Sequence, residues 1–144
     1  MVELVYSPSI QARWLKSLRM NEQATRRPLV LVVEDEAIIA LNIHDELQDA
    51  GYRVAGPFTT CLAALEWLEI ATPDAAILDA VLKDGPCREI ALALSCRKVP
   101  FLIYSGHCED HPMLGEFHHV TWIEKPIRIE ELIQACQQLL VDWD

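Results

Sequence analysis

Short, mostly apolar runs alternate with amphipathic stretches from Pro28 to the end of the chain. The runs are too short for helices, and their content of apolar and β-branched residues is typical of strands that are buried on both faces of a sheet. Five strands are predicted in this way, at residues 29–33, 52–58, 75–78, 100–104 and 120–123.

The intervening stretches carry apolar residues at the three- and four-residue spacing of helices that pack against a sheet. The first is expected over 37–50, with Gly51 just after its end. The second begins after an N-cap at Thr59 or Thr60 and ends before Thr72-Pro73. Two more are expected at 86–97 and 130–140, whereas a helix within 106–119 is expected to be short or poorly formed, because two glycines and a proline interrupt it.

Strands that alternate with helices predict an α/β fold of the (βα)5 type, a doubly wound five-stranded parallel sheet with helices on both faces. The pattern starts at Pro28, so we divide the chain into an N-terminal extension, 1–27, and a domain, 28–144. The extension could form a short amphipathic helix, with Ser7-Pro8 at its start, that docks on a partner or forms a homodimer. The alternative is a tail that packs loosely on the domain.

Charge differs sharply between these two parts. The extension has a net charge of +3, which leaves −13 for the remaining 117 residues of a chain whose total is −10. An acidic domain argues against direct binding of nucleic acid, which normally requires a basic patch. No apolar run approaches the roughly 20 residues of a membrane span, and no secretory signal is evident. Five cysteines without a CxxC pair are typical of free thiols, so we expect a cytoplasmic protein.

Charged and polar side chains stand where the predicted strands end. Glu34 and Asp35 follow the first strand, Asp79 the third, Ser105 the fourth and Lys125 the fifth. These side chains should meet in one crevice, because the carboxyl ends of parallel strands share an edge of the sheet. Clustered carboxylates require a cation, and Mg²⁺ prefers such oxygen ligands. The hydroxyl and the ammonium group could contact a phosphoryl group, for which Asp79 is the best-placed nucleophile.

Four segments in this order resemble the receiver domain of bacterial two-component response regulators, which has a flavodoxin-like fold. They are Leu31-Val32-Val33-Glu34-Asp35-Glu36, Ile77-Leu78-Asp79, Tyr104-Ser105-Gly106 and Lys125-Pro126. The resemblance covers residues 28 to about 142 and implies that Asp79 accepts a phosphoryl group from a histidine kinase or a phosphotransfer protein. It also implies that Ser105 and Lys125 contact that group, and that Mg²⁺ is bound by Glu34, Asp35, Asp79 and the backbone carbonyl of Val81.

The segment 100–107 also resembles, in part, the PFxFATGY motif of single-domain receivers, whose partners are often kinases of the HWE or a related type. Pro100, Phe101 and Gly106 match and Ser105 is a conservative change, whereas Ile103, Tyr104 and His107 depart from the motif. The length of the chain leaves little beyond the receiver, so we expect a single-domain regulator whose output is an unknown downstream protein.

Two further residues are candidates for the conformational switch that the resemblance implies. Trp122 stands three residues before Lys125, where many receivers have an aromatic side chain that changes rotamer on phosphorylation. Tyr104 could do the same, and the alternative for Trp122 is simple packing on its strand. Val81 is apolar and cannot orient an attacking water, so we expect slow self-dephosphorylation. His107 could still reach the site and alter the lifetime of the phosphorylated form.

Other interpretations remain open at this point. The protein could be an adaptor that uses a receiver fold without being phosphorylated. It could also be a phosphohydrolase with an aspartate nucleophile, although such enzymes place a second Asp where Val81 stands. Zinc binding by the histidines and the cysteine of 107–119 is a further alternative, but their spacing matches no usual zinc site.

Overall fold

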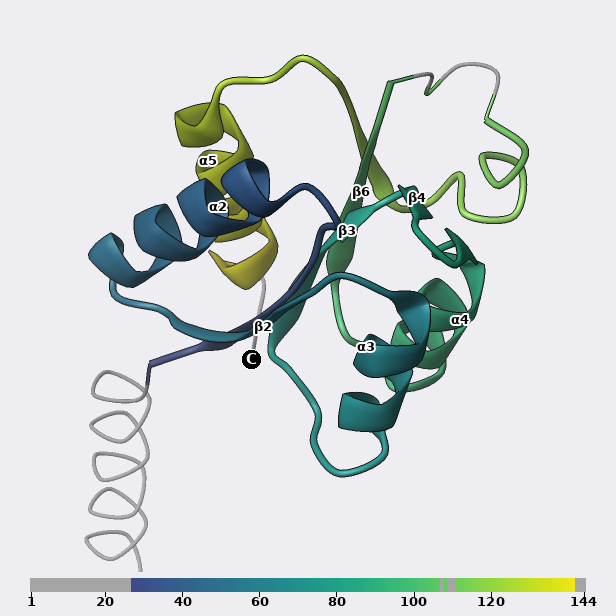
Figure 1. The fold of residues 1–144 in the computed structure, drawn as a ribbon, viewed down its shortest axis with the longest axis horizontal. Coiled ribbons are helices and arrows are strands. Elements are labelled where there is room, and N and C mark those ends of the chain that lie inside the picture. The colour runs from purple at the N-terminus through teal and green to yellow at the C-terminus, as the bar shows by residue number, and fades with distance from the viewer. Residues whose placement is uncertain (1–26, 107, 109–110, 142–144) are drawn as a thin grey trace, which may run out of the picture.

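The computed structural model describes residues 27–106, 108 and 111–141, and its core is a five-stranded parallel sheet with the strand order β2-β1-β3-β6-β7 (Figure 1). The doubly wound α/β fold expected from the sequence is confirmed. The strands of this sheet are β1 (Leu29–Val33), β2 (Arg53–Phe58), β3 (Ala75–Asp79), β6 (Phe101–Ser105) and β7 (Thr121–Glu124).

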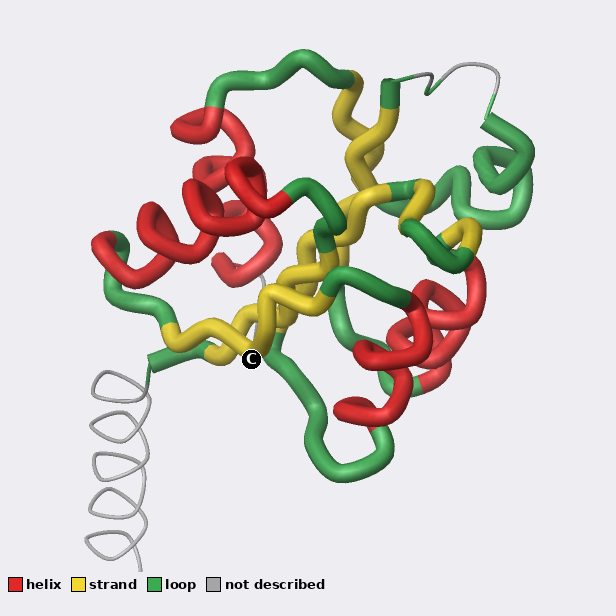
Figure 2. The backbone as a smooth tube through the Cα atoms, in the orientation of Figure 1, coloured by secondary structure: helices red, strands yellow, loops and turns green. Residues whose placement is uncertain are grey.

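Four helices within the described residues cover the two faces of the sheet. α2 (Ala37–Asp49) and α5 (Ile129–Val141) pack together on one face, and α3 (Cys61–Leu68) and α4 (Arg88–Cys96) pack together on the other. Figure 2 shows the strands running between these two pairs of helices. The second helix ends at Leu68, earlier than predicted, because 69–70 continue only as a turn.

The strands contribute to two apolar cores, because successive side chains of a strand point to opposite faces. In β1, Val30 and Val32 belong to the core beneath α2 and α5, whereas Leu31 and Val33 belong to the core beneath α3 and α4. The same alternation holds in β3 and β6, and Tyr104 of β6 points to the α2 and α5 side. This burial on both faces explains why the strands appear in the sequence as unbroken apolar runs.

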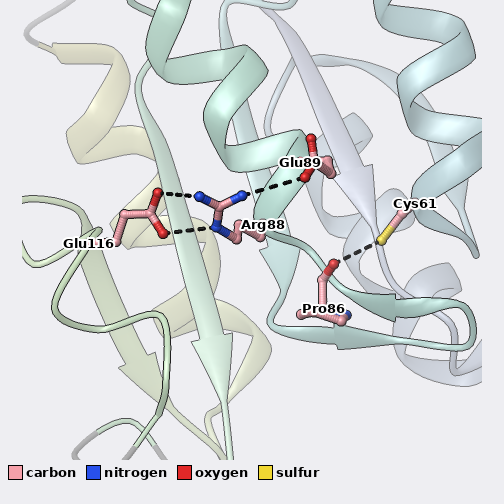
Figure 3. Close-up of polar contacts among 5 residues, drawn as sticks. All are labelled: Cys61, Pro86, Arg88, Glu89 and Glu116. Atoms are coloured by element: carbon pink, nitrogen blue, oxygen red, sulfur yellow. Dashed lines mark hydrogen bonds and ion pairs between the residues drawn. The ribbon is translucent and has the colours of Figure 1, made fainter.

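A small hairpin that the sequence did not predict follows β3. It consists of β4 (Val81–Leu82) and β5 (Gly85–Pro86), which pair in antiparallel fashion. Strands of two residues are too short to show any periodicity. The thiol of Cys61 contacts the carbonyl of Pro86 at 3.3 Å, so the hairpin is attached to the start of α3 (Figure 3).

Residues 111–120 form a series of turns in place of a helix, in line with the breakers at Pro112 and Gly115. Met113 and Phe117 are nevertheless buried, and the Phe117 ring meets that of Phe101 edge to face. Arg88 of α4 holds this segment from outside with two hydrogen bonds of 2.9 Å to the carboxylate of Glu116, as Figure 3 shows. The segment is therefore ordered by tertiary contacts.

The predicted amphipathic helix of the N-terminal extension falls on residues 1–26, which lie outside the described part of the chain. It therefore stays a prediction, as does the docking or dimerisation assigned to it. Within the described residues, none of the helices combines the length and the apolar character that crossing a bilayer requires.

Candidate functional site

The polar residues singled out at the strand ends all lie at the carboxyl edge of the sheet. Asp79 and Ser105 are the last residues of β3 and β6, and Glu34 and Lys125 directly follow β1 and β7. The order of the strands brings them together, because β3 lies between β1 and β6, and β6 pairs with β7. The main chain reinforces this arrangement, since the Lys125 N–H donates to the Ser105 carbonyl at 2.8 Å.

Three carboxylates form the acidic part of the site. Glu34, Asp35 and Asp79 each offer an oxygen, and these oxygens lie within 4.8 Å of one another. Glu34 is fully buried and Asp79 is only 6% exposed, whereas Asp35 is partly exposed at the mouth. Such a group of hard oxygen donors, one of them open to solvent, fits the ligand preferences of a small divalent cation.

Lys125 supplies the positive charge of the site. Its Nζ lies 3.3 Å from Asp79 Oδ2 and 3.9 Å from Glu34 Oε1. The same atom stands 4.6 Å from the centre of the Tyr104 ring. The peptide bond between Lys125 and Pro126 is cis. One ammonium group therefore contacts two of the three carboxylates and leaves an excess of negative charge.

Tyr104 is connected to the acidic cluster in a way that sequence reasoning did not anticipate. Its hydroxyl donates a hydrogen bond of 2.5 Å to Glu34 Oε1, and both side chains are buried. The other oxygen, Glu34 Oε2, accepts from the backbone N–H of Glu36 at 3.3 Å. The available clue was positional: a tyrosine next to Ser105 in an apolar strand is expected to have a partner for its hydroxyl.

Burial and repulsion between like charges shift the ionisation of this cluster. Burial raises the pKa of Glu34 above its usual 4.5, and the neighbouring Asp79 raises it further. Burial also raises the pKa of Asp35, with Glu34 as the next cause. Desolvation, followed by the bond to Glu34, raises the pKa of the Tyr104 hydroxyl, which therefore stays protonated as a donor. The lysine alone does not neutralise the site, and an added cation would relieve this repulsion.

Ser105 and Val81 border the cluster. Ser105 is 6% exposed and ends the strand next to Asp79, so the predicted hydroxyl lies at the same edge of the sheet. The Val81 backbone N–H approaches Asp79 Oδ1 at 3.4 Å, and its apolar side chain is 56% exposed. Val81 is thus adjacent to the predicted phosphoacceptor, as its two-residue spacing required.

Trp122 is half-buried against the core beneath α3 and α4. Its indole N–H donates to the Phe117 carbonyl at 2.9 Å, and its ring centre is 5.2 Å from that of His111. These contacts attach it to the 111–120 segment. The rotamer change predicted for Trp122 stays a prediction.

The zinc alternative has no support among the described residues. Potential metal ligands gather there, in a group of three or more, at Glu34, Asp35 and Asp79, and this group contains no histidine or cysteine. The rings of His118 and His119 contact each other, and His111 packs on Trp122. His107, the predicted modifier of the phosphate lifetime, lies outside the described residues.

Comparison with known proteins identifies the family to which this chain belongs. A family model of the response regulator receiver domain matches residues 30–137. The chain is a member of the response regulator receiver domain family. The prediction that the sequence resembles receivers is therefore confirmed.

Individual relatives agree with this assignment. The receiver is 31% identical to SdrG from Sphingomonas melonis Fr1, with a TM-score of 0.66 over 79% of this chain and 97% of that one. It is 31% identical over 88% of its length to a probable transcriptional regulatory protein of Picosynechococcus sp., and 28% identical over 75% of its length to the transcriptional regulatory protein PdtaR of Mycobacterium tuberculosis. The chain spans about half the length of these two regulatory proteins, 54% in each case.

Proposed function

We propose that this receiver accepts a phosphoryl group on Asp79 in a Mg²⁺-dependent reaction, with a histidine kinase or a histidine phosphotransfer protein as the donor. The observation that carries the proposal is the cluster of Glu34, Asp35 and Asp79 with the Lys125 ammonium 3.3 Å from Asp79 Oδ2. Three carboxylates around one buried strand end are costly in themselves. They are well suited to a reaction in which a cation and a phosphoryl group arrive together.

In the proposed reaction, one Asp79 oxygen attacks the phosphorus atom of a phosphohistidine. The new P–O bond forms while the P–N bond breaks, and its electron pair leaves with the imidazole, which takes up a proton. A bound magnesium ion would supply positive charge for the phosphoryl oxygens, held by Glu34, Asp35 and Asp79 together with the Val81 carbonyl. The chain's own part is to hold Asp79 in place and to present positive charge and donors to the phosphoryl oxygens.

Lys125 and Ser105 are the residues that we propose respond to the phosphoryl group. Lys125 already pairs with Asp79, so the ammonium can exchange a carboxylate oxygen for a phosphoryl oxygen over a short distance. Ser105, at the end of the neighbouring strand, offers a hydroxyl donor. Their movement would bias Trp122 or Tyr104 and the 111–120 segment, as a shift between two packings.

The signal would then pass to an unidentified downstream protein, with no direct contact to nucleic acid or membrane. The net charge of −13 on residues 28–144 supports this. The proposal includes a cytoplasmic location, which the free state of all five cysteines supports.

Intact mass after incubation of the full chain with Mg²⁺ and acetyl phosphate tests the proposal. We expect a stable mass gain of one phosphoryl group, which requires Mg²⁺ and is absent in Asp79→Asn. Asp49→Asn is the matched control, since it makes the same chemical change at an exposed position of α2, outside the acidic cluster. Steady release of phosphate with turnover would indicate a phosphohydrolase, and no adduct at all would indicate an adaptor that is not phosphorylated.

A further inference from the structure

One buried side chain, Tyr104, contacts both charged parts of the site. Its hydroxyl is bonded to the Glu34 carboxylate at 2.5 Å, and its ring lies 4.6 Å from the Lys125 ammonium. Tyr104 is 2% exposed and Glu34 is fully buried, so water does not compete for the bond between them, whereas the Lys125 side chain is 27% exposed. Tyr104 is therefore in a position to influence the acidic and the basic component together.

The hydroxyl of Tyr104 fixes the orientation of Glu34. One carboxylate oxygen accepts from this hydroxyl, and the other accepts from the Glu36 N–H at 3.3 Å. A glutamate side chain has three rotatable bonds and needs such partners to hold one geometry. With both oxygens engaged, the carboxylate faces the cluster in a single orientation that it shares with Asp35 and Asp79.

The ring of Tyr104 helps to determine the position of Lys125. The ammonium lies closer to Asp79, at 3.3 Å, than to Glu34, at 3.9 Å. A cation over an aromatic face is stabilised by the ring quadrupole, also where the cation is partly exposed. The hydroxyl meanwhile engages Glu34 Oε1, the atom to which Lys125 would otherwise be drawn.

Packing alone would not maintain this arrangement. Tyr104 and Lys125 line a cavity of about 410 Å³, whose other walls are apolar and include Ile39, Ile127 and Leu132. Both side chains therefore have space on that side. Without the hydroxyl, Glu34 Oε1 would be a buried acceptor that has lost its donor, and the Lys125 ammonium, 3.9 Å away, could move in to replace it.

We propose that Tyr104 is a positioning residue that keeps Glu34 available to the metal and Lys125 available to Asp79, by keeping Lys125 and Glu34 from approaching more closely than their present 3.9 Å. This rests on the proposed function of the site. It is distinct from the predicted switch role of Tyr104, because it acts before any phosphoryl group is present.

The test compares the wild-type chain with Tyr104→Phe, which retains the ring and removes only the hydroxyl. Titration calorimetry of the unphosphorylated protein should show that the dissociation constant for Mg²⁺ rises about tenfold, the effect of losing one hydrogen bond to a charged group. Phosphorylation by acetyl phosphate should slow at low Mg²⁺ and recover at saturating Mg²⁺. This split between affinity and maximal rate is not expected from a general loss of stability.

Tyr52→Phe is the matched control, because Tyr52 packs in the same core and also has a bonded hydroxyl, but precedes β2 at the opposite edge of the sheet. Tyr104→Leu removes the ring as well and should lower the maximal rate even at saturating Mg²⁺. Equal or tighter Mg²⁺ binding by Tyr104→Phe, with a functional wild type, would overturn the inference. Failure of the wild type to bind Mg²⁺ or to be phosphorylated would instead overturn the proposed function.

Discussion

At the scale of single residues, the proposed phosphoacceptor is almost buried, whereas a neighbour two residues later is not. Asp79 is 6% exposed, whereas the side chain of Val81, two residues later, is 56% exposed and apolar. A residue so close to the phosphoryl group could orient a water molecule for hydrolysis only if it carried a polar group. Val81 carries none, so we expect the proposed phosphorylated form to be long-lived.

We therefore predict that Val81→Asn shortens the lifetime of the phosphorylated protein by about tenfold or more, since positioned polar groups assist such reactions by this factor or more. Lifetimes are measured by intact mass after the acetyl phosphate has been removed. Val81→Ala is the control, because it is smaller but equally apolar and should leave the lifetime close to that of the wild type. A wild-type half-life of seconds, or an unchanged lifetime in Val81→Asn, would contradict this account.

At the scale of elements, helix α3 begins with two caps. Thr60 accepts from the Ala63 N–H at 3.1 Å, and Asp84 of the β4–β5 hairpin accepts from the N–H groups of Cys61 and Leu62 at 2.8 and 3.1 Å. The free N–H groups and the dipole of a helix start favour a negative charge there. These bonds lower the pKa of Asp84 below its usual 3.8.

A pKa that is lower in the folded state means that ionised Asp84 stabilises the fold above its unfolded pKa, and that this contribution is lost as pH falls through the folded pKa. Asp84→Ala should therefore have a lower urea midpoint than the wild type at neutral pH. The difference should shrink as pH falls below 3.8, the usual value. Lys83→Ala, at the exposed neighbouring position, is the control. A difference that stays constant down to about pH 3 would exclude this linkage.

The ion pair between Arg88 and Glu116 joins α4 to the 111–120 segment. It has two parallel hydrogen bonds of 2.9 Å, whereas the contact of Arg88 with Glu89 is a single one of 3.5 Å (Figure 3). Both side chains of the pair are well exposed, at 47% and 41%, so solvent reduces its strength. Its effect should be local rather than global.

Glu116→Ala should accelerate hydrogen exchange in 111–120 while lowering the free energy of unfolding by no more than about 1 kcal/mol. Glu89→Ala removes the weaker contact of the same arginine and should leave the exchange unchanged. If the two variants behaved alike, the paired geometry would have no special role.

Some elements of the fold could be predicted from the sequence, and others could not. Strands buried on both faces were predictable, because their apolar runs follow from the burial itself. The β4–β5 hairpin was not, since two-residue strands have no period, and neither was the early end of α3 at Leu68. At the site, the positions of Asp79 and Lys125 at strand ends predicted that these two side chains meet. The bond from Tyr104 to Glu34 could not be predicted, because it joins residues 70 positions apart and depends on the register of β6.

At the scale of the whole molecule, three of the 22 acidic side chains lie where the proposed chemistry needs them. The chain carries −10 overall, and three of its carboxylates converge at the edge of the sheet with one lysine. Because the chain spans about half the length of its curated relatives, what those longer proteins do beyond their receiver part does not transfer to it directly. For this chain, the proposed function therefore depends above all on phosphorylation of the Asp79 carboxylate.

Reductive trapping tests that claim most directly. An aspartyl phosphate is an acyl phosphate, and borohydride reduces it to an alcohol while free carboxylates are unaffected. After phosphorylation with Mg²⁺ and acetyl phosphate, peptide mass spectrometry of the reduced full chain should find homoserine in place of Asp79, and only when Mg²⁺ was present. Homoserine at another aspartate, or at none in a chain that had gained phosphate, would contradict the account.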